Sequence, residues 1–392
     1  MRDLLLGLQP KDFDVVTDAH PEQIKALFRN CRLIGRRFRL AHVHFGRDVI
    51  EVATFRGSHE SAQPHHEAQT DDEGMILRDN VFGSLEEDVW RRDFTINALY
   101  YNIADFSLVD FVGAMDDINQ RVIRLIGDPE QRYREDPVRM LRAARFAAKL
   151  GFKIDTASRE PIFDMAEDLQ SIPPARLFDE SLKLFLGGKA VDSYVALKEL
   201  GLFEELFPVV SESEALFDDE LLLKALANTD ERKRLEKPVT PAFLFAAILW
   251  DPVWRMVKDL CQRGGSEHDA FARASDVVIS RTIETVAIPK RFAIPMREIW
   301  RMQPRFELRR GKRPSRFMGH PRFRAAYDFM LLRAAVGQAD PELAVWWEAF
   351  QEASDNQRTQ MLTTGQSKGS KGTGENGKKR RRRRSSPKKP AQ

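Results

Sequence analysis

The sequence predicts an α+β protein, in which a small mixed α/β head is followed by an all-α neck and body and a disordered basic tail. Runs rich in β-forming residues are confined to the N-terminal third, and helical apolar spacing dominates from residue 136 onward. Residues 365–392 consist mainly of Gly, Ser, Lys and Arg. A chain of 392 residues suggests two or three domains. We place the boundaries at 1–125 for the head, 126–190 for the neck, 191–360 for the body and 361–392 for the tail.

The composition excludes several classes of protein. Hydrophobic residues make up 42% of the chain, too many for a generally disordered protein. No run of 18 apolar residues occurs, so we expect no membrane span, and the N-terminus lacks the pattern of a signal peptide. The two cysteines, Cys31 and Cys261, exclude a disulfide framework and a four-cysteine zinc site. We therefore expect a reduced, cytoplasmic protein.

The head alternates strand and helix patterns. Strands are predicted at 13–17, 38–45, 49–55 and 108–111, and helices at 21–30 and 94–101. A turn is expected at 46–48, between the second and third strands. Residues 57–87 are polar and rich in His, Asp and Gly, which predicts a long loop of the kind that is usually functional or disordered.

Helices dominate the rest of the chain. The first is predicted to run from Pro137 to Leu150, with Asp136 as its N-cap and Gly151 as its stop. Further helices are predicted at 176–186, 190–200, 218–227, 241–250, 267–285, 291–303, 321–336 and 341–353.

Acidic residues on predicted strands indicate a metal site. Asp12 and Asp14 are two residues apart, so their carboxylates point to the same face. Glu51 interrupts an otherwise apolar strand, where an unpaired carboxylate is costly to bury. Three such carboxylates match a site for two Mg²⁺ ions, which Mn²⁺ also fits, in phosphoryl or nucleotidyl transfer. An acidic turn and a solvent-exposed Glu51 are the structural alternatives.

A second motif spans residues 91–99, Arg-Arg-Asp-Phe-Thr-Ile-Asn-Ala-Leu. Arg91 and Arg92 stand at the expected start of a helix, where two guanidinium groups and the helix N-terminus would hold a triphosphate. Asn97 would share a helix face with Asp93 and hydrogen-bond a ribose hydroxyl. An N-cap role for Asp93 is the structural alternative.

A third motif begins with Glu135 and Asp136. Glu135, Arg139 and Arg142 have the spacing of residues stacked along one helix face. Asp136 and Arg139 offer a hydrogen-bond acceptor and donor at nearly fixed separation. Adenine presents a donor amino group beside an acceptor ring nitrogen, so this pair would read that base without a template. An N-cap with surface ion pairs is the structural alternative.

Two basic segments indicate a polyanionic partner. Residues 290–316 hold ten Lys or Arg and two Glu, interleaved with Trp300 and Phe306, which favours an RNA-binding surface. The residues predicted to form this surface are Arg297, Arg301, Arg309, Arg310, Lys312 and Arg313. Residues 365–392 carry eleven basic residues and one acid, against 51 and 58 in residues 1–364. This tail would attract a polyanion or, alternatively, act only as a solubilising segment.

In this order, the three motifs resemble the class II nucleotidyltransferases of the polymerase-β superfamily, which comprise the tRNA CCA-adding enzymes and the bacterial poly(A) polymerases. The resemblance covers about residues 1–330. Segments 36–43 and 237–244 and the basic C-terminal extension resemble the poly(A) polymerases more closely.

The resemblance implies roles for individual residues. It implies that Asp12 and Asp14 are catalytic metal ligands and that Asp93 is a catalytic residue of an arginine–aspartate block. It also implies that the base-selecting motif of the family corresponds to Glu135, Asp136 and Arg139. Which acid is the third at the metal site stays open, because strand geometry favours Glu51 and the resemblance favours Asp93.

The expected activity is template-independent transfer of AMP from ATP to RNA 3′ ends, with release of pyrophosphate and the use of two Mg²⁺ ions. One alternative is CCA addition to tRNA. Another is an inactive RNA-binding protein, because the Gly-Gly pair and strand that precede Arg-Asp-Leu-Leu-Leu-Gly in the family have no counterpart before residues 2–7.

Overall fold

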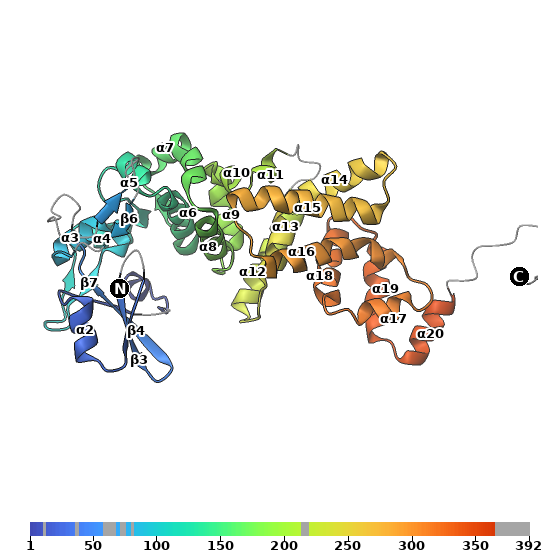
Figure 1. Ribbon diagram of the computed structural model, residues 1–392, viewed down its shortest axis with the longest axis horizontal. Helices are drawn as coiled ribbons and strands as arrows, with labels where there is room; N and C mark the ends of the chain where they lie inside the picture. Colours follow the sequence, from blue (N-terminus) through green and yellow to red (C-terminus); the bar gives the residue numbers. More distant parts are fainter. Residues whose placement is uncertain are drawn as a thin grey trace, which may run out of the picture.

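The computed structural model describes residues 1–10, 13–35, 39–57, 68–70, 76–79, 82–212 and 219–364. The elements follow one another in space nearly in chain order, with the sheet at one end and the last helices at the other (Figure 1). Within the described residues, no helix is long and apolar enough to cross a membrane. The predicted tail lies outside the described residues from position 365 onward.

The head combines short strands with short helices. Its elements are α1 (Arg2–Leu5), β1 (Asp14–Thr17), α2 (Pro21–Leu27), β2 (Cys31–Ile34), β3 (Leu40–Phe45), β4 (Asp48–Thr54), β5 (Ala68–Thr70), β6 (Ile76–Asp79), α3 (Leu85–Arg91), the 3₁₀ turn η2 (Thr95–Asn97), β7 (Tyr100–Tyr101), β8 (Leu108–Val109), α4 (Ala114–Gln120) and β9 (Val122–Ile123).

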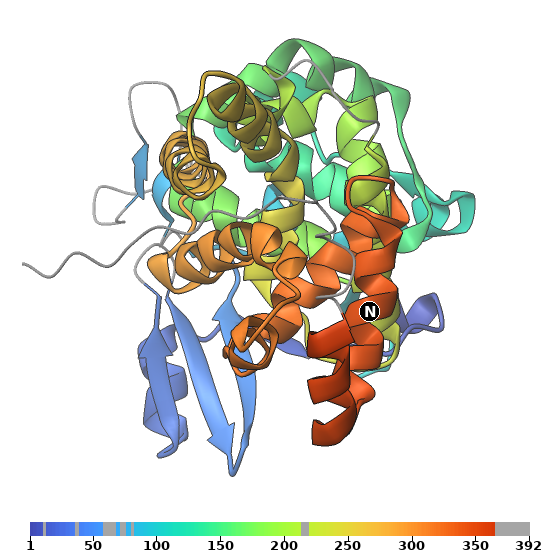
Figure 2. The same cartoon turned by 90° about the vertical axis from the view of Figure 1, so that its right-hand side faces the viewer.

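The main sheet has four strands in the order β1-β4-β3-β2, with β1 parallel to β4 and the other pairs antiparallel. The β3–β4 hairpin turns at Gly46, whose φ of 63° suits glycine. Helix α2 starts with Pro21 at its first turn and packs Ile24 against Cys31, Ala41 and Val43. Figure 2 shows these strands extending away from the helices on one side of the molecule.

The neck is a helical unit that packs against the end of the head. It comprises α5 (Pro129–Glu135), α6 (Val138–Leu150), β10 (Lys153–Ile154), α7 (Thr156–Met165), η3 (Ala166–Ser171) and α8 (Pro174–Phe185). Helix α6 ends at Gly151, whose φ of 66° permits the left-handed cap that was predicted there. Phe94 of the head is fully buried against Phe146 of α6, with ring centroids 5.7 Å apart.

The body continues as packed helices. They are α9 (Ala190–Glu199), α10 (Leu202–Leu206), α11 (Pro208–Ser211), α12 (Glu220–Arg234), α13 (Pro241–Ile248), α14 (Trp250–Gln262), α15 (Glu267–Thr285), α16 (Lys290–Met302), η4 (Gln303–Glu307), α17 (Arg313–Met318), α18 (Phe323–Ala335), α19 (Pro341–Glu352) and α20 (Asp355–Thr364).

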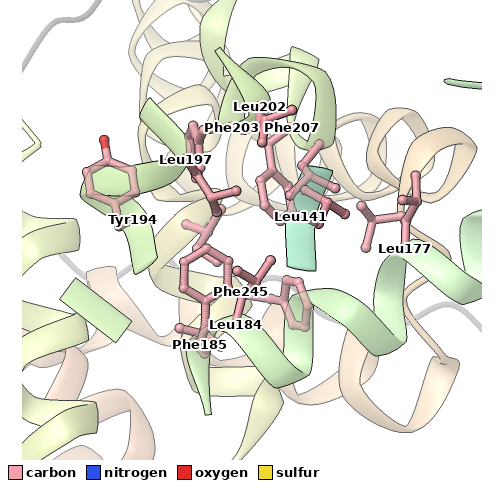
Figure 3. Close-up of a cluster of buried hydrophobic side chains, with 14 of the residues drawn as sticks. Leu141, Leu177, Leu184, Phe185, Tyr194, Leu197, Leu202, Phe203, Phe207 and Phe245 are labelled. Carbon is pink, nitrogen blue, oxygen red and sulfur yellow. The ribbon is translucent and has the colours of Figure 1, made fainter. Parts of the chain in front are cut away.

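One hydrophobic core joins the neck to the body. Leu141 of α6 and Leu184 of α8 meet Phe203 and Phe245 of the body in this core (Figure 3). A second core, which includes Trp347, stabilises the C-terminal helices. Burial of this size is the main source of stability in the helical part of the chain.

The predicted α+β class is confirmed, but two predictions in the head are wrong. The helix expected at 94–101 is the short turn η2 followed by strand β7. The loop expected at 57–87 contains β5 and β6 and the start of α3. Helix α3 begins at a capping box between Ser84 and Glu87, a local signal that the polar composition of the segment obscured. The domain boundaries stay predictions.

Candidate active site

Two of the predicted metal-binding acids lie side by side on the sheet. Asp14 of β1 and Glu51 of β4 are register partners in a parallel pair, so their side chains share one face of the sheet. Both residues are exposed, and Glu51 Oε1 lies 3.1 Å from His42 Nε2 on β3. Exposed carboxylate oxygens are the donors that Mg²⁺ prefers, so this pair fits the predicted metal.

The third predicted ligand, Asp12, lies outside the described residues. Among the residues that the structure does describe, no cluster of three or more His, Cys, Asp or Glu is placed to hold a metal ion. The complete metal site therefore stays a prediction, supported by the juxtaposition of Asp14 and Glu51.

Arg91 and Arg92 lie at the end of a helix and not at its start. Arg91 is the last residue of α3, and Arg92 is its C-cap. A helix C-terminus carries partial negative charge, so the predicted contribution of a helix N-terminus to triphosphate binding is wrong. The assignment of Arg92 to nucleotide binding stays a prediction that rests on its side chain.

The guanidinium of Arg92 is held by Asp88 and Tyr100. Arg92 Nη2 lies 3.1 Å from Asp88 Oδ2, and Arg92 Nε donates to the Tyr100 hydroxyl at 2.6 Å. Asp88 is buried; burial raises its pKa, but Arg92, the Tyr100 hydroxyl and Arg56 outweigh that effect and lower it. The buried carboxylate therefore stays ionised and fixes the direction of Arg92.

Asp93 joins the head to the neck. Its Oδ2 accepts a hydrogen bond of 2.6 Å from Arg142 Nε on α6, and its Oδ1 accepts from Asn97 Nδ2 at 3.0 Å and from the Phe94 amide at 2.8 Å. Burial raises the pKa of this carboxyl, but Arg142 and Asn97 together lower it below its ordinary value. Asp93, Asn97 and Arg142 are thus brought together. Arg2 of α1 donates to Asn97 as well.

The third motif spans a corner between two helices. Glu135 is the last residue of α5, whereas Arg139 and Arg142 belong to α6, so the predicted single helix face is wrong. The chain leaves the helical conformation at Asp136, where φ is −155°. Glu135 and Arg139 still form an ion pair of 2.9 Å across the corner, and the Arg139 side chain is buried.

Asp136 forms an ion pair with a residue of α8, another helix of the neck. Its Oδ2 lies 2.7 Å from Arg176 Nη2 on α8, and its Oδ1 accepts from the Val138 amide at 3.3 Å. Helix α6 begins one residue later than predicted, with Pro137 at the N-cap, although Asp136 still supplies an acceptor to the first turn. Asp136 and Arg139 therefore occupy the same corner, each oriented by an oppositely charged partner.

Three residues of this arrangement were missed by the sequence analysis: Asp88, Arg132 and Arg176. Arg132 of α5 donates to the backbone oxygens of Arg91 and Arg92, at 2.9 and 2.6 Å. Asp88 and Arg92 have the i, i+4 spacing of a helical ion pair, which a prediction of α3 would have revealed. The contacts of Arg132 and Arg176 join segments about 40 residues apart, and no local pattern indicates them.

The predicted RNA-binding residues lie on and after α16. Arg297 forms an ion pair of 3.1 Å with Asp276, which reduces its availability. Arg301, Arg310 and Arg313 are exposed, and within the described part of the chain no acid forms an ion pair with them. Lys312 is exposed as well, and Arg309 is half-buried. Gly311 turns this basic segment with a φ of 64°.

Comparison with known proteins identifies the family. Poly(A) polymerase I of Salmonella typhimurium is 51% identical over 370 residues, which cover 92% of this chain and 80% of that protein. Poly(A) polymerase I of Haemophilus influenzae is 49% identical over 369 residues, covering 92% and 82%. The chain belongs to the poly(A) polymerase family. It is an RNA nucleotidyltransferase, as the resemblance predicted.

Family models divide this poly(A) polymerase homologue into matching segments. The poly(A) polymerase head domain matches residues 1–124, the probable RNA- and SrmB-binding site of polymerase A matches 151–213, and the arginine-rich C-terminus of polymerase A matches 263–387. The CCA-adding enzyme of Lactobacillus helveticus is more distant, with 32% identity over 55% of this chain and 52% of that enzyme.

Solved structures agree on the fold. A tRNA nucleotidyltransferase complexed with a primer tRNA and an incoming ATP analogue superimposes with a TM-score of 0.59, at 22% identity, over 90% of this chain and 93% of that one. A tRNA-processing enzyme superimposes with a TM-score of 0.60 at 20% identity, over 90% and 85%. The poly(A) polymerase family member therefore shares its overall fold with tRNA nucleotidyltransferases.

Proposed function

We propose that this protein adds AMP from ATP to the 3′ ends of RNA in the cytoplasm, without a template and with release of pyrophosphate. The observation that carries the proposal is the similarity to poly(A) polymerase I, which extends over nine-tenths of the chain at about half identity. The paired carboxylates on the sheet and the Asp136–Arg139 corner support it, since their positions suit a metal-binding face and a base-reading pair.

The chemistry is assigned to the face of the sheet that carries Asp14 and Glu51. Asp12, Asp14 and Glu51 would hold two Mg²⁺ ions, or Mn²⁺ in their place. Metals held by these residues would supply charge neutralisation and activation of the attacking 3′-hydroxyl. Glu51 is the third acid of this proposal because it is the register partner of Asp14 and its side chain is exposed, whereas the carboxylate of Asp93 is nearly buried and bound by Arg142.

The nucleotide is assigned to the junction of head and neck. Arg92 and Arg142 would bind the triphosphate, and Asn97 the ribose. Asp136 would accept the adenine amino proton, and Arg139, braced by Glu135, would donate to the ring nitrogen. Asp93 orients Arg142 and Asn97 in this scheme. Guanidinium groups that are fixed before binding lose little entropy when a phosphate arrives, which favours catalysis by positioning.

The RNA is assigned to the cations at the end of α16 and directly after it. These are the exposed Arg301, Arg310, Lys312 and Arg313 and the half-buried Arg309, with Arg297 at their edge. Phosphate contacts of this kind fix the position of a strand without reading its sequence. A polymerase that extends many RNA ends needs this property.

A primer-extension assay tests the proposal. A 5′-labelled RNA with a free 3′-hydroxyl is incubated with Mg²⁺ and one nucleoside triphosphate at a time, and a tRNA lacking its terminal CCA is incubated with CTP and ATP. We expect a long homopolymer from ATP alone. We also expect Asp14→Ala to abolish extension while RNA binding persists, because the RNA contacts of this proposal are assigned to the basic residues 297–313 and not to the sheet.

Three outcomes contradict the proposal. Addition that requires CTP and stops after three nucleotides on the tRNA would identify a CCA-adding enzyme. RNA binding with no extension by any nucleotide would identify an inactive binding protein. Loss of RNA binding in Asp14→Ala would contradict the separation of the catalytic face from the RNA surface.

A further inference from the structure

The side chain of Arg132 bridges the two halves of the proposed nucleotide site. Its Nη2 donates to the backbone oxygens of Arg91 and Arg92 at 2.9 and 2.6 Å, and its Nη1 lies 2.7 Å from Glu135 Oε2. The first two acceptors belong to the head and the third to the neck. One planar guanidinium thus bonds to the head through one nitrogen and to the neck through another. Arginine has this forked arrangement of donors and lysine does not.

The oxygens that Arg132 reaches cannot be satisfied by helix α3 itself. Arg91 is the last residue of α3 and Arg92 its C-cap, so their carbonyl groups have no intrahelical donor. Arg132 supplies both with a hydrogen bond and holds the backbone from which the side chain of Arg92 departs. Its own side chain is only 12% exposed, so water is a poor replacement for these bonds.

The other end of Arg132 braces the base-reading residues. Glu135 Oε2 accepts from Arg132 Nη1 and also, at 2.9 Å, from Arg139 Nη1. The backbone oxygen of Arg132 accepts a second bond from Arg139 Nη1 at 2.5 Å. Burial and the nearby Arg139 lower the pKa of Arg132 to about 10, which leaves it charged at neutral pH. Arg139 is thus positioned by both the side chain and the backbone of Arg132.

We propose that Arg132 is a positioning residue for nucleotide selection, which fixes the distance between the Arg91–Arg92 backbone and the Glu135–Arg139 base-reading pair. This inference rests on the proposed function. With the phosphate-binding and base-reading groups held at a fixed separation, adenine reaches its hydrogen-bond partners only when the triphosphate is seated. A looser separation would let other bases reach productive positions.

The test is the preference for ATP over CTP, measured as the ratio of kcat/KM values in primer extension. For Arg132→Met we expect this ratio to fall about tenfold, which is the lower end of the effect of removing the hydrogen-bond partner of a metal ligand. Arg132→Lys keeps the charge but cannot span both acceptors, so we expect it to lower the ratio as well.

Two neighbouring variants are matched controls. Tyr133→Phe removes a buried hydrogen bond of 2.7 Å from the same helix to the Ser158 backbone oxygen, so it tests the effect of destabilisation alone. Arg134→Met removes an exposed charge that pairs with Glu130. We expect both controls to keep the wild-type ratio. If Tyr133→Phe lowered the ratio as much as Arg132→Met, general destabilisation would explain the effect and the proposal would be overturned.

A second measurement does not depend on activity. Amide hydrogen exchange in residues 91–97, without nucleotide, should be at least tenfold faster in Arg132→Lys than in the wild type, and unchanged in Tyr133→Phe. If exchange in Arg132→Lys were the same as in the wild type, the proposed bridge by Arg132 between head and neck would be overturned, whatever the extension activity of the variant. If the wild type failed to extend RNA with ATP while exchange responded as expected, the proposed function would fail and the bridge would stand.

Discussion

Replacing Asp93 by Asn should loosen the junction of head and neck. The Asp93 carboxylate receives Arg142, Asn97 and the Phe94 amide, and its side chain is 10% exposed. Asn keeps an acceptor but turns a donor amide toward Arg142 or loses its other bonds. Breaking a buried ion pair costs about 3–5 kcal/mol. Because the Arg142 side chain is 32% exposed and recovers some hydration, we expect a cost of about 2–3 kcal/mol.

Amide hydrogen exchange in α6 measures this cost locally, as the free energy of opening. We expect exchange in Asp93→Asn to be about thirty- to 150-fold faster, since each 1.4 kcal/mol is a factor of ten. In a double-mutant cycle, Arg142→Met should have little further effect in the Asp93→Asn background. Arg134→Met, an exposed change, is the matched control with no expected effect.

The pH dependence has a defined sign. The pKa of Asp93 in the folded protein is below its ordinary value of 3.8, because Arg142 and Asn97 outweigh burial. The stabilisation is therefore complete above that ordinary value and is lost as pH falls through the lowered one. The ratio of variant to wild-type exchange should be constant from about pH 5 to about pH 8. If the Asp93→Asn variant exchanged its α6 amides at the wild-type rate but no longer extended RNA, Asp93 would be assigned to the chemistry and its role at the junction would be refuted.

Three further predictions address the chemistry, the base and the RNA. Glu51→Gln should lower RNA extension at least about hundredfold with unchanged RNA affinity, because mutating even a hydrogen-bond partner of a metal ligand can lower activity by about that factor. Extension within threefold of wild type would remove Glu51 from the metal site. Asp136→Ser keeps an oxygen for the Val138 amide, but the shorter side chain cannot extend to adenine, so the ratio of kcat/KM for ATP over CTP should fall. An unchanged ratio would leave Asp136 with only a structural role. Arg309→Glu combined with Arg310→Glu should weaken RNA binding and reduce the slope of log K against log salt by about 1.4, while KM for ATP stays the same; an unaltered slope would place the RNA elsewhere.

The fold was predictable where local signals are strong. Helix α6 was found because Pro137, its apolar stripe and Gly151 all point to one answer. The β3–β4 hairpin was found from alternating residues around Gly46. The segment at 94–101 was misread because its apolar spacing fits a helix, whereas Phe94 pairs with Leu125 in a β-bridge and the Thr95 amide donates to Arg124. Long-range pairing overrode the local pattern there.

The residues of the site were easier to predict than their partners. Asp14 stands out by its spacing from Asp12, and Asp93 and Arg139 by the charged motifs in which they lie. Arg132 and Arg176 lie in segments where an arginine is unremarkable by sequence alone, and their significance comes from contacts about 40 residues away. Such contacts are set by the packing of helices, which composition and spacing do not encode.

The arginines assigned to the nucleotide share one feature, which is that each is already held by an acid. Arg92 is paired with Asp88, Arg139 with Glu135 and Arg142 with Asp93. Such pairing reduces the field that a triphosphate experiences, so it weakens attraction at long range. In exchange, the guanidinium groups keep one direction, and little ordering remains when the ligand binds. In the proposed site, selection would therefore depend on the fixed distances between donors and acceptors more than on total positive charge. That is the condition under which a protein surface can replace a template.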